Sequence, residues 1–138
     1  MTAKQYLEQL STLDRMLSDK LDQIYQLRIT ASNPSCCMDG ERVQTSMSAD
    51  KMADIVAKII MLEEECDTLQ DRYADLRRTI ITKTNMLTGK HKDIIRKRYI
   101  EKKSIHAIAQ DVGITDRGVK KAHKRALEEF TKIMQIRY

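Results

Sequence analysis

Apolar residues recur at every third or fourth position from residue 2 to residue 31, which is the spacing of one face of a helix. Lys20 is the one polar residue in this series, and we expect the neighbouring Leu21 to take its place. The stretch 2–31 is therefore predicted to be one helix. Its apolar positions are Tyr6, Leu10, Leu13, Leu17, Ile24, Leu27 and Ala31.

The pattern stops between residues 32 and 49, where the sequence reads SNPSCCMDGERVQTSMSA. This segment contains Pro34 and Gly40 among small polar residues, which is typical of a connector. We expect Ser48 to cap the next helix, and Asp50 suits its first turn because a carboxylate is stabilised by the helix dipole there.

A longer repeat follows, with apolar steps of three and four over residues 52–87 and one polar exception, Lys83. The pattern predicts a coiled-coil seam on a helix of about 50 Å at about 1.5 Å per residue. The partner is either the first helix, folded back through the connector as a hairpin, or a second copy of the chain, and both can apply. The seam positions are Met52, Ile55, Ile59, Leu62, Cys66, Leu69, Tyr73, Leu76, Ile80, Lys83 and Leu87.

Gly89 is expected to end this helix, and the charge balance changes at the same place. Residues 1–88 carry 11 Lys/Arg and 14 Asp/Glu, a net charge of −3, whereas residues 89–138 carry 14 and 6, a net charge of +8. We therefore expect an N-terminal helical domain over 1–88, with its connector at 32–49, and a C-terminal domain over 89–138. The basic half indicates a polyanionic partner for the C-terminal domain.

The composition favours an all-α fold and excludes several kinds of chemistry. One Pro, four Gly and 33% charged residues are typical of long exposed helices. No stretch is long enough to span a membrane, and the charged N-terminus is unlike a signal peptide, so we expect a cytoplasmic protein. Three cysteines, two of them adjacent, form no disulfide framework or zinc-ligand spacing. We also find no nucleophile–base set around His91 or the other histidines, and expect no metal, no cofactor and no enzymatic activity.

Three short helical patterns follow residue 89, over 90–102, 104–113 and from 115 onward. The last two have helix-turn-helix spacing. Ala109 is the small residue where the helices cross, Gly113 tolerates the positive φ of the turn, and Val119 fills the angle between the helices. Ser104 is expected to cap the second helix, and Thr115 or Asp116 the third.

Basic residues gather on the outward face of the third helix near its start, which is the part of a helix-turn-helix that enters the major groove. We expect Lys120, Lys121 and Lys124 to contact phosphates, and Arg117 to contact a guanine edge. Gly118 is expected to weaken this helix slightly. The full set of candidate DNA-binding residues is Lys102, Lys103, Ser104, Thr115, Asp116, Arg117, Lys120, Lys121, Lys124 and Arg125.

The run IIRKRYIEKKSIHAIAQDVGITDRGVKKAHKRALEEF, residues 94–130, resembles region 4 of bacterial sigma factors. The shared features are the Arg-x-Arg-aromatic run ending at Tyr99 and the Ala-Leu-x-x-aromatic run ending at Phe130. The whole chain resembles bacteriophage transcription regulators of the ArpU/RinA type, most distinctively over residues 40–59. The resemblance implies control of phage late genes in a bacterial host by promoter binding, and leaves contact with host RNA polymerase open.

Two other functions stay open from the sequence. The C-terminal domain could bind RNA polymerase or a sigma factor without touching DNA. The chain could also be a small terminase subunit, although those usually carry the DNA-reading unit first, and here it comes last.

Overall fold

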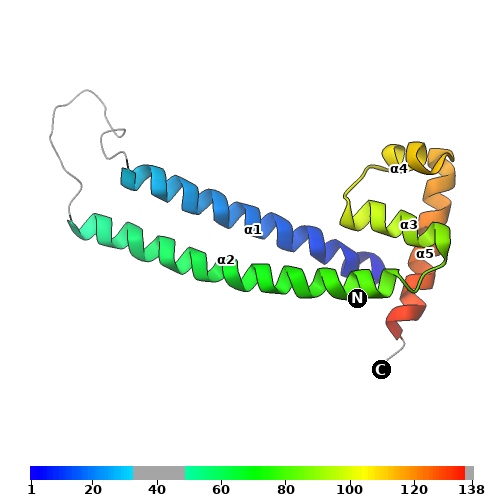
Figure 1. Cartoon of the computed structure of the whole chain (residues 1–138), viewed down its shortest axis with the longest axis horizontal. Coiled ribbons are helices and arrows are strands. Elements are labelled where there is room, and N and C mark those ends of the chain that lie inside the picture. Colours follow the sequence, from blue (N-terminus) through cyan, green and yellow to red (C-terminus); the bar gives the residue numbers. More distant parts are fainter. Residues whose placement is uncertain (33–48, 136–138) are drawn as a thin grey trace. The chain divides into compact units, whose positions relative to one another are not determined.

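The computed structural model describes residues 1–32 and 49–135, and within these ranges every regular element is helical (Figure 1). The predicted all-α fold is confirmed. Most of the predicted connector, including Ser48, lies outside the described residues. In chain order the elements are α1 (Ala3–Ser32), α2 (Ala49–Thr84), α3 (Gly89–Ile95), the π-helical turn η2 (Arg96–Ile100), α4 (Ile105–Val112) and α5 (Asp116–Gln135).

The chain divides into two compact units that both include parts of the long helices. The head unit comprises Met1–Asp14 and Arg72–Tyr138, and the hairpin unit comprises Arg15–Asp71. The first turns of α1 and the last turns of α2 thus belong to the same unit as the C-terminal helices. The domain border expected at residue 88 stays a prediction.

In the hairpin unit, α1 and α2 pack against each other through the predicted seam. Ile24, Cys66 and Leu69 are buried there. Arg28 of α1 forms an ion pair with Glu63 of α2. The intrachain hairpin is therefore the arrangement that the long apolar stripe of α2 adopts.

The expectation that Leu21 replaces Lys20 in the seam is wrong. Leu21 is 48% exposed. The side chain of Lys20 is 26% exposed and its ammonium forms an ion pair with Glu65 of α2. The helical period places residue 20 at the seam, and a lysine can satisfy that position because its apolar stem packs while its charged end reaches a carboxylate.

The core of the head unit joins both long helices to the C-terminal helices. Phe130 of α5 is fully buried, and its ring lies 6.2 Å from that of Tyr6 of α1, centroid to centroid. Lys83, the one polar position in the seam of α2, places its Nζ 5.0 Å from the centre of the Tyr6 ring, a cation–π distance. The buried members of this core are Ala3, Leu7, Leu10, Ile80, Leu87, Ile95, Tyr99, Ala126 and Phe130.

Helix α2 ends three residues before the predicted end, and Gly89 does not stop it. The amide of Met86 donates to the carbonyl of Lys83 at 3.1 Å, and that of Leu87 to Thr84 at 3.0 Å, which tightens the chain into a turn. This turn carries Leu87 into the core, where it is 6% exposed. Gly89 instead opens α3, and Thr88 precedes it as the N-cap residue.

Candidate nucleic-acid interface

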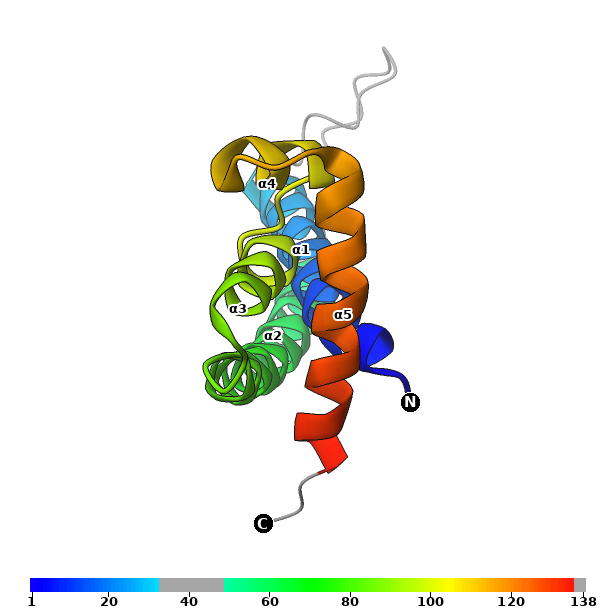
Figure 2. The same cartoon turned by 90° about the vertical axis from the view of Figure 1, so that its right-hand side faces the viewer.

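Helices α4 and α5 are joined by a tight turn and lie beside α3 (Figure 2). The three helices enclose a small apolar core. Ile94, Ile108, Ala109 and Val119 are its buried members. Ala109 is 4% exposed at the predicted small position. These positions agree with the predicted helix-turn-helix spacing.

The turn between α4 and α5 depends on a left-handed residue. Gly113 has φ 78° and ψ 28°, and its amide donates to the carbonyl of Ala109 at 2.9 Å. At the other end of α4, the Ser104 hydroxyl accepts from the amide of Ala107 at 3.2 Å. Both predicted helix signals are confirmed, and together they fix the short first helix of the motif.

The start of α5 is capped by Thr115. Its Oγ1 accepts a hydrogen bond from the amide of Gly118 at 3.2 Å. The structure also explains on steric grounds why a glycine occupies position 118. A Cβ there would lie 3.3 Å from Thr115 Oγ1 and 3.6 Å from Ile114 Cδ1. The glycine thus makes room for the cap at the N-terminus of the helix predicted to read DNA.

Five cationic side chains form what we call the α5 basic face: Arg117, Lys120, Lys121, Lys124 and Arg125, all of them exposed. At about 100° per residue they fall within an arc of about 140°. That arc lies opposite the buried side of the helix, which is formed by Val119, Ala126 and Phe130.

No acidic side chain within the described residues forms an ion pair with any member of the α5 basic face. Unpaired, exposed guanidinium and ammonium groups retain their full attraction for an external anion. They also need not break an internal contact to bind one.

The other candidate DNA-binding residues form ion pairs or hydrogen bonds with other residues of the chain. Lys102, which has φ 56°, forms an ion pair with Asp14 of α1. Lys103 lies 2.6 Å from the Asp111 carboxylate, whose hydrogen bond raises the pKa of the lysine. Asp116 lies 3.3 Å from His106 Nδ1. Ser104 and Thr115 accept backbone bonds as caps, so the structure leaves the α5 basic face as the unpaired part of the candidate set.

A contact that the sequence pattern did not reveal connects η2 to α5. The Tyr99 hydroxyl and His123 Nε2 are 2.9 Å apart, and the two rings stack with centroids 5.7 Å apart. Burial raises the pKa of Tyr99 to about 12 and lowers the pKa of His123 below its usual 6.5. The lowered pKa favours the uncharged form of His123, so we do not include it in the α5 basic face.

A second unforeseen contact joins α5 to the start of α3. Glu129 Oε2 lies 2.5 Å from His91 Nδ1, and Glu129 Oε1 accepts from the amide of Thr88 at 3.2 Å. The hydrogen bond from His91 is the main reason that the pKa of Glu129 is lowered. The sequence alone gave His91 no carboxylate partner. Thr88 Oγ1 approaches the same imidazole nitrogen, at 3.4 Å, so the three groups do not form a proton relay through both ring nitrogens.

The described ranges contain no group of three or more His, Cys, Asp and Glu side chains that could hold a metal ion. Nor does any described helix combine the length and apolar character needed to cross a membrane.

Comparison with known proteins places the similarity on the helix-turn-helix. No curated protein and no solved structure matched the chain. One family model did match, over about a third of the chain, from the turn after α2 into α5. Residues 85–129 match the family described as sigma-70, region 4, and this match supports a sigma-like helix-turn-helix regulator that binds DNA.

Proposed function

We propose that the chain is a sequence-specific DNA-binding transcription regulator of the ArpU/RinA type that controls phage late genes. The observation that carries this proposal is the α5 basic face, which is exposed, unpaired and adjacent to a capped helix start. In a helix-turn-helix the first turns of the second helix enter the major groove.

The members of the face have different roles in this proposal. Lys120, Lys121 and Lys124 neutralise phosphates, which raises affinity without reading sequence. Arg117 lies in the first turn of α5 and has the planar fork that pairs with the O6 and N7 of guanine. Thr115 acts mainly as the helix cap, because its hydroxyl already accepts the amide of Gly118.

We further propose that the hairpin unit pairs with a second copy of the chain, through α2 and the flank of α1. A two-helix layer leaves one side of each helix in water unless another layer covers it. The exposed large apolar residues of this unit include Leu21, Tyr25 and Ile29 at four-residue steps on α1, and Val56 and Ile60 on α2. Tyr25 is 62% exposed and Ile60 is 51% exposed. A dimer of this kind would present two helix-turn-helix motifs to a palindromic site.

The test of DNA binding uses the full chain and a site recovered by selection from a random DNA pool. Arg117→Ala should weaken binding about 5- to 150-fold and relax base preference at one position, as expected for about 1–3 kcal/mol from a bidentate base contact. Lys121→Ala should weaken binding similarly on every sequence and reduce the salt slope by about one. Lys132→Ala is the matched control, because Lys132 is an exposed lysine further along α5.

Equal affinity of the Arg117→Ala/Lys121→Ala double variant and the unaltered chain would reject the assignment of the face. Capture of RNA polymerase with no gel shift at low salt would instead favour an interaction protein that does not contact DNA. A ring of eight or more copies in light scattering would favour a small terminase subunit, and a mass of two chains would support the dimer.

A further inference from the structure

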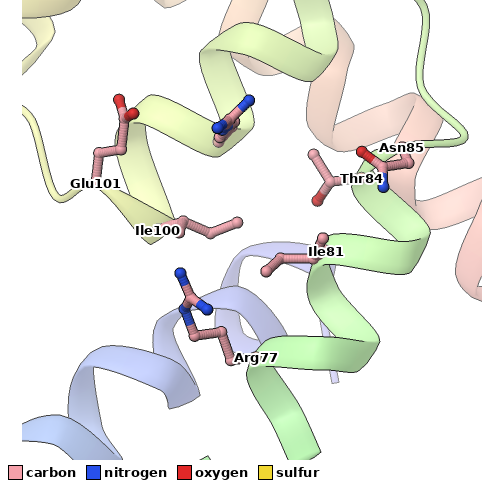
Figure 3. Close-up of a pocket in the computed structure, with 7 residues that line it drawn as sticks. Arg77, Ile81, Thr84, Asn85, Ile100 and Glu101 are labelled. Atoms are coloured by element: carbon pink, nitrogen blue, oxygen red, sulfur yellow. The ribbon is translucent and has the colours of Figure 1, made fainter. Parts of the chain in front are cut away.

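A pocket of about 290 Å³ opens in the head unit beside the end of α2 and the η2 turn (Figure 3). It is remote in sequence from the α5 basic face, and the proposed function does not use it. Its floor and rim combine two arginines, two apolar side chains and three other polar ones. These residues are Arg77, Ile81, Thr84, Asn85, Arg96, Ile100 and Glu101.

The pocket is lined by two arginines and one acid, so its lining carries a net positive charge. Arg77 and Arg96 are both exposed, and neither forms an ion pair within the described ranges. Glu101, the one acid that lines the pocket, lies 3.7 Å from the ammonium of Lys103. Guanidinium groups bind carboxylate and phosphate oxygens through two parallel hydrogen bonds, so this pocket suits an oxyanion.

Thr84 supplies a second and independent sign of a ligand. It is 2% exposed, and its hydroxyl is the one buried side-chain group in the described residues that lacks a hydrogen-bond partner. Thr79 and Thr82 on the same helix donate to the carbonyl four residues earlier, each at 2.9 Å. Figure 3 shows the Thr84 oxygen on the side that faces Ile81 and the pocket. Buried polar groups without partners are rare, so a group that fills the pocket and bonds this hydroxyl would account for it.

We propose that this pocket binds a small organic oxyanion, a carboxylate or a phosphate ester. Arg77 and Arg96 hold its charged end, and Thr84 and Asn85 bond its polar atoms. The volume of about 290 Å³ lies just below the usual range for small-molecule sites, about 300–1,000 Å³, which limits the ligand to a small molecule. Ile81 and Ile100 provide an apolar surface for its body. A shallower hollow of about 520 Å³ also has Arg77 and Ile81 in its lining, so the body of the ligand could extend into it.

The experiment is a titration of the full chain with inorganic phosphate and, separately, with acetate, each against sodium chloride of equal ionic strength. Amide and arginine-side-chain NMR signals are followed. We expect saturable chemical-shift changes at Thr84, Asn85, Arg77 and Arg96. The anion that binds with the higher affinity, phosphate or acetate, indicates whether the ligand carries a phosphate or a carboxylate. Shifts that stay linear with concentration, or that chloride reproduces, would overturn the proposal.

Variants make the site assignment specific. Arg77→Gln and Arg96→Gln should each weaken anion binding at least tenfold, whereas Arg72→Gln, an exposed arginine on the same helix, should leave it unchanged. Thr84→Val keeps the shape of the side chain and removes the unbonded hydroxyl. It should weaken anion binding without lowering the urea midpoint of unfolding. Unchanged anion affinity in the Arg77→Gln/Arg96→Gln double variant would refute the site.

A DNA-binding measurement on the same variants separates this proposal from the proposed function. If the double variant loses DNA affinity while free phosphate never binds the unaltered chain, these arginines contact a DNA backbone and the pocket proposal fails. If phosphate binds as expected but the chain shifts no DNA, the DNA-binding proposal fails and the pocket stands.

Discussion

Replacing Gly118 by alanine tests whether the cap of α5 and the glycine three residues later depend on each other. Alanine inside a helix is favoured over glycine by about 0.8–1 kcal/mol when nothing crowds the new methyl group. Here a Cβ would lie 3.3 Å from Thr115 Oγ1, so the threonine has to give way by a few tenths of an ångström. That movement stretches a cap hydrogen bond that is already 3.2 Å long.

The expected change in stability follows from comparing the loss of the cap with the gain in helix propensity. Losing an N-cap costs about 1 kcal/mol, so partial loss of the Thr115 bond offsets most of the gain from alanine. We expect Gly118→Ala to change the free energy of unfolding by less than about 0.5 kcal/mol. In a Thr115→Ala background the crowding oxygen is gone, and Gly118→Ala should then stabilise by about 1 kcal/mol. The difference is a coupling free energy of at least about 0.5 kcal/mol.

Urea unfolding followed by circular dichroism measures the four free energies, with equal m-values required across the set. Gly89→Ala is the matched control, because a Cβ there would meet nothing within 4 Å and alanine should not be penalised. The proposed crowding would be refuted if Gly118→Ala raised the free energy of unfolding by about 1 kcal/mol in the unaltered chain. That gain would equal the one expected for Gly118→Ala in the Thr115→Ala background.

Three other predictions concern contacts found only in the structure. Because the pKa of Glu129 is lowered by His91, this contact stabilises the fold above the usual carboxyl pKa and is lost as pH falls through the lowered value. Glu129→Gln should therefore flatten the fall in the urea midpoint between about pH 5 and pH 3. Spectrophotometric titration should find one tyrosine that ionises near 12, and Tyr99→Phe should abolish that step; an unchanged titration would contradict the burial of Tyr99 against His123. Lys20→Leu should raise the urea midpoint. The ion pair with Glu65 contributes only about 0–1 kcal/mol, whereas a leucine in the seam buries more apolar area. A lower midpoint would contradict the expectation that apolar burial outweighs the ion pair here.

Local signals in the sequence predicted much of the head unit. Ser104 caps α4, Ala109 lies where the helices cross and Gly113 adopts the left-handed turn, all as predicted. These roles could be predicted because caps, helix crossings and left-handed turns depend on residues a few positions apart. The alternation of three and four steps likewise identified the buried side of α2. Such features need no knowledge of what packs from elsewhere in the chain.

Distant contacts explain the predictions that failed or were incomplete. Gly89 was expected to stop α2, but the helix ends at Thr84 and the turn after it places Leu87 in the core. Lys102 was grouped with the basic residues of α5, but Asp14, far away in the sequence, pairs with it. Nothing in the residue pattern links His91 to Glu129, since only the packing of α3 on α5 brings them together. The pattern of charges alone therefore could not separate paired from unpaired cations.

Photocrosslinking tests most directly the proposal that the α5 basic face lies against duplex DNA. A photoreactive benzoylphenylalanine is placed at Lys121 in the full chain, and at the exposed Lys58 of α2 as the control position. Each variant is irradiated with the selected DNA site in radiolabelled form. Efficient DNA attachment from position 121 and none from position 58 is the predicted result. Equal yields from both positions, or attachment from position 58 alone, would contradict DNA contact by the α5 basic face.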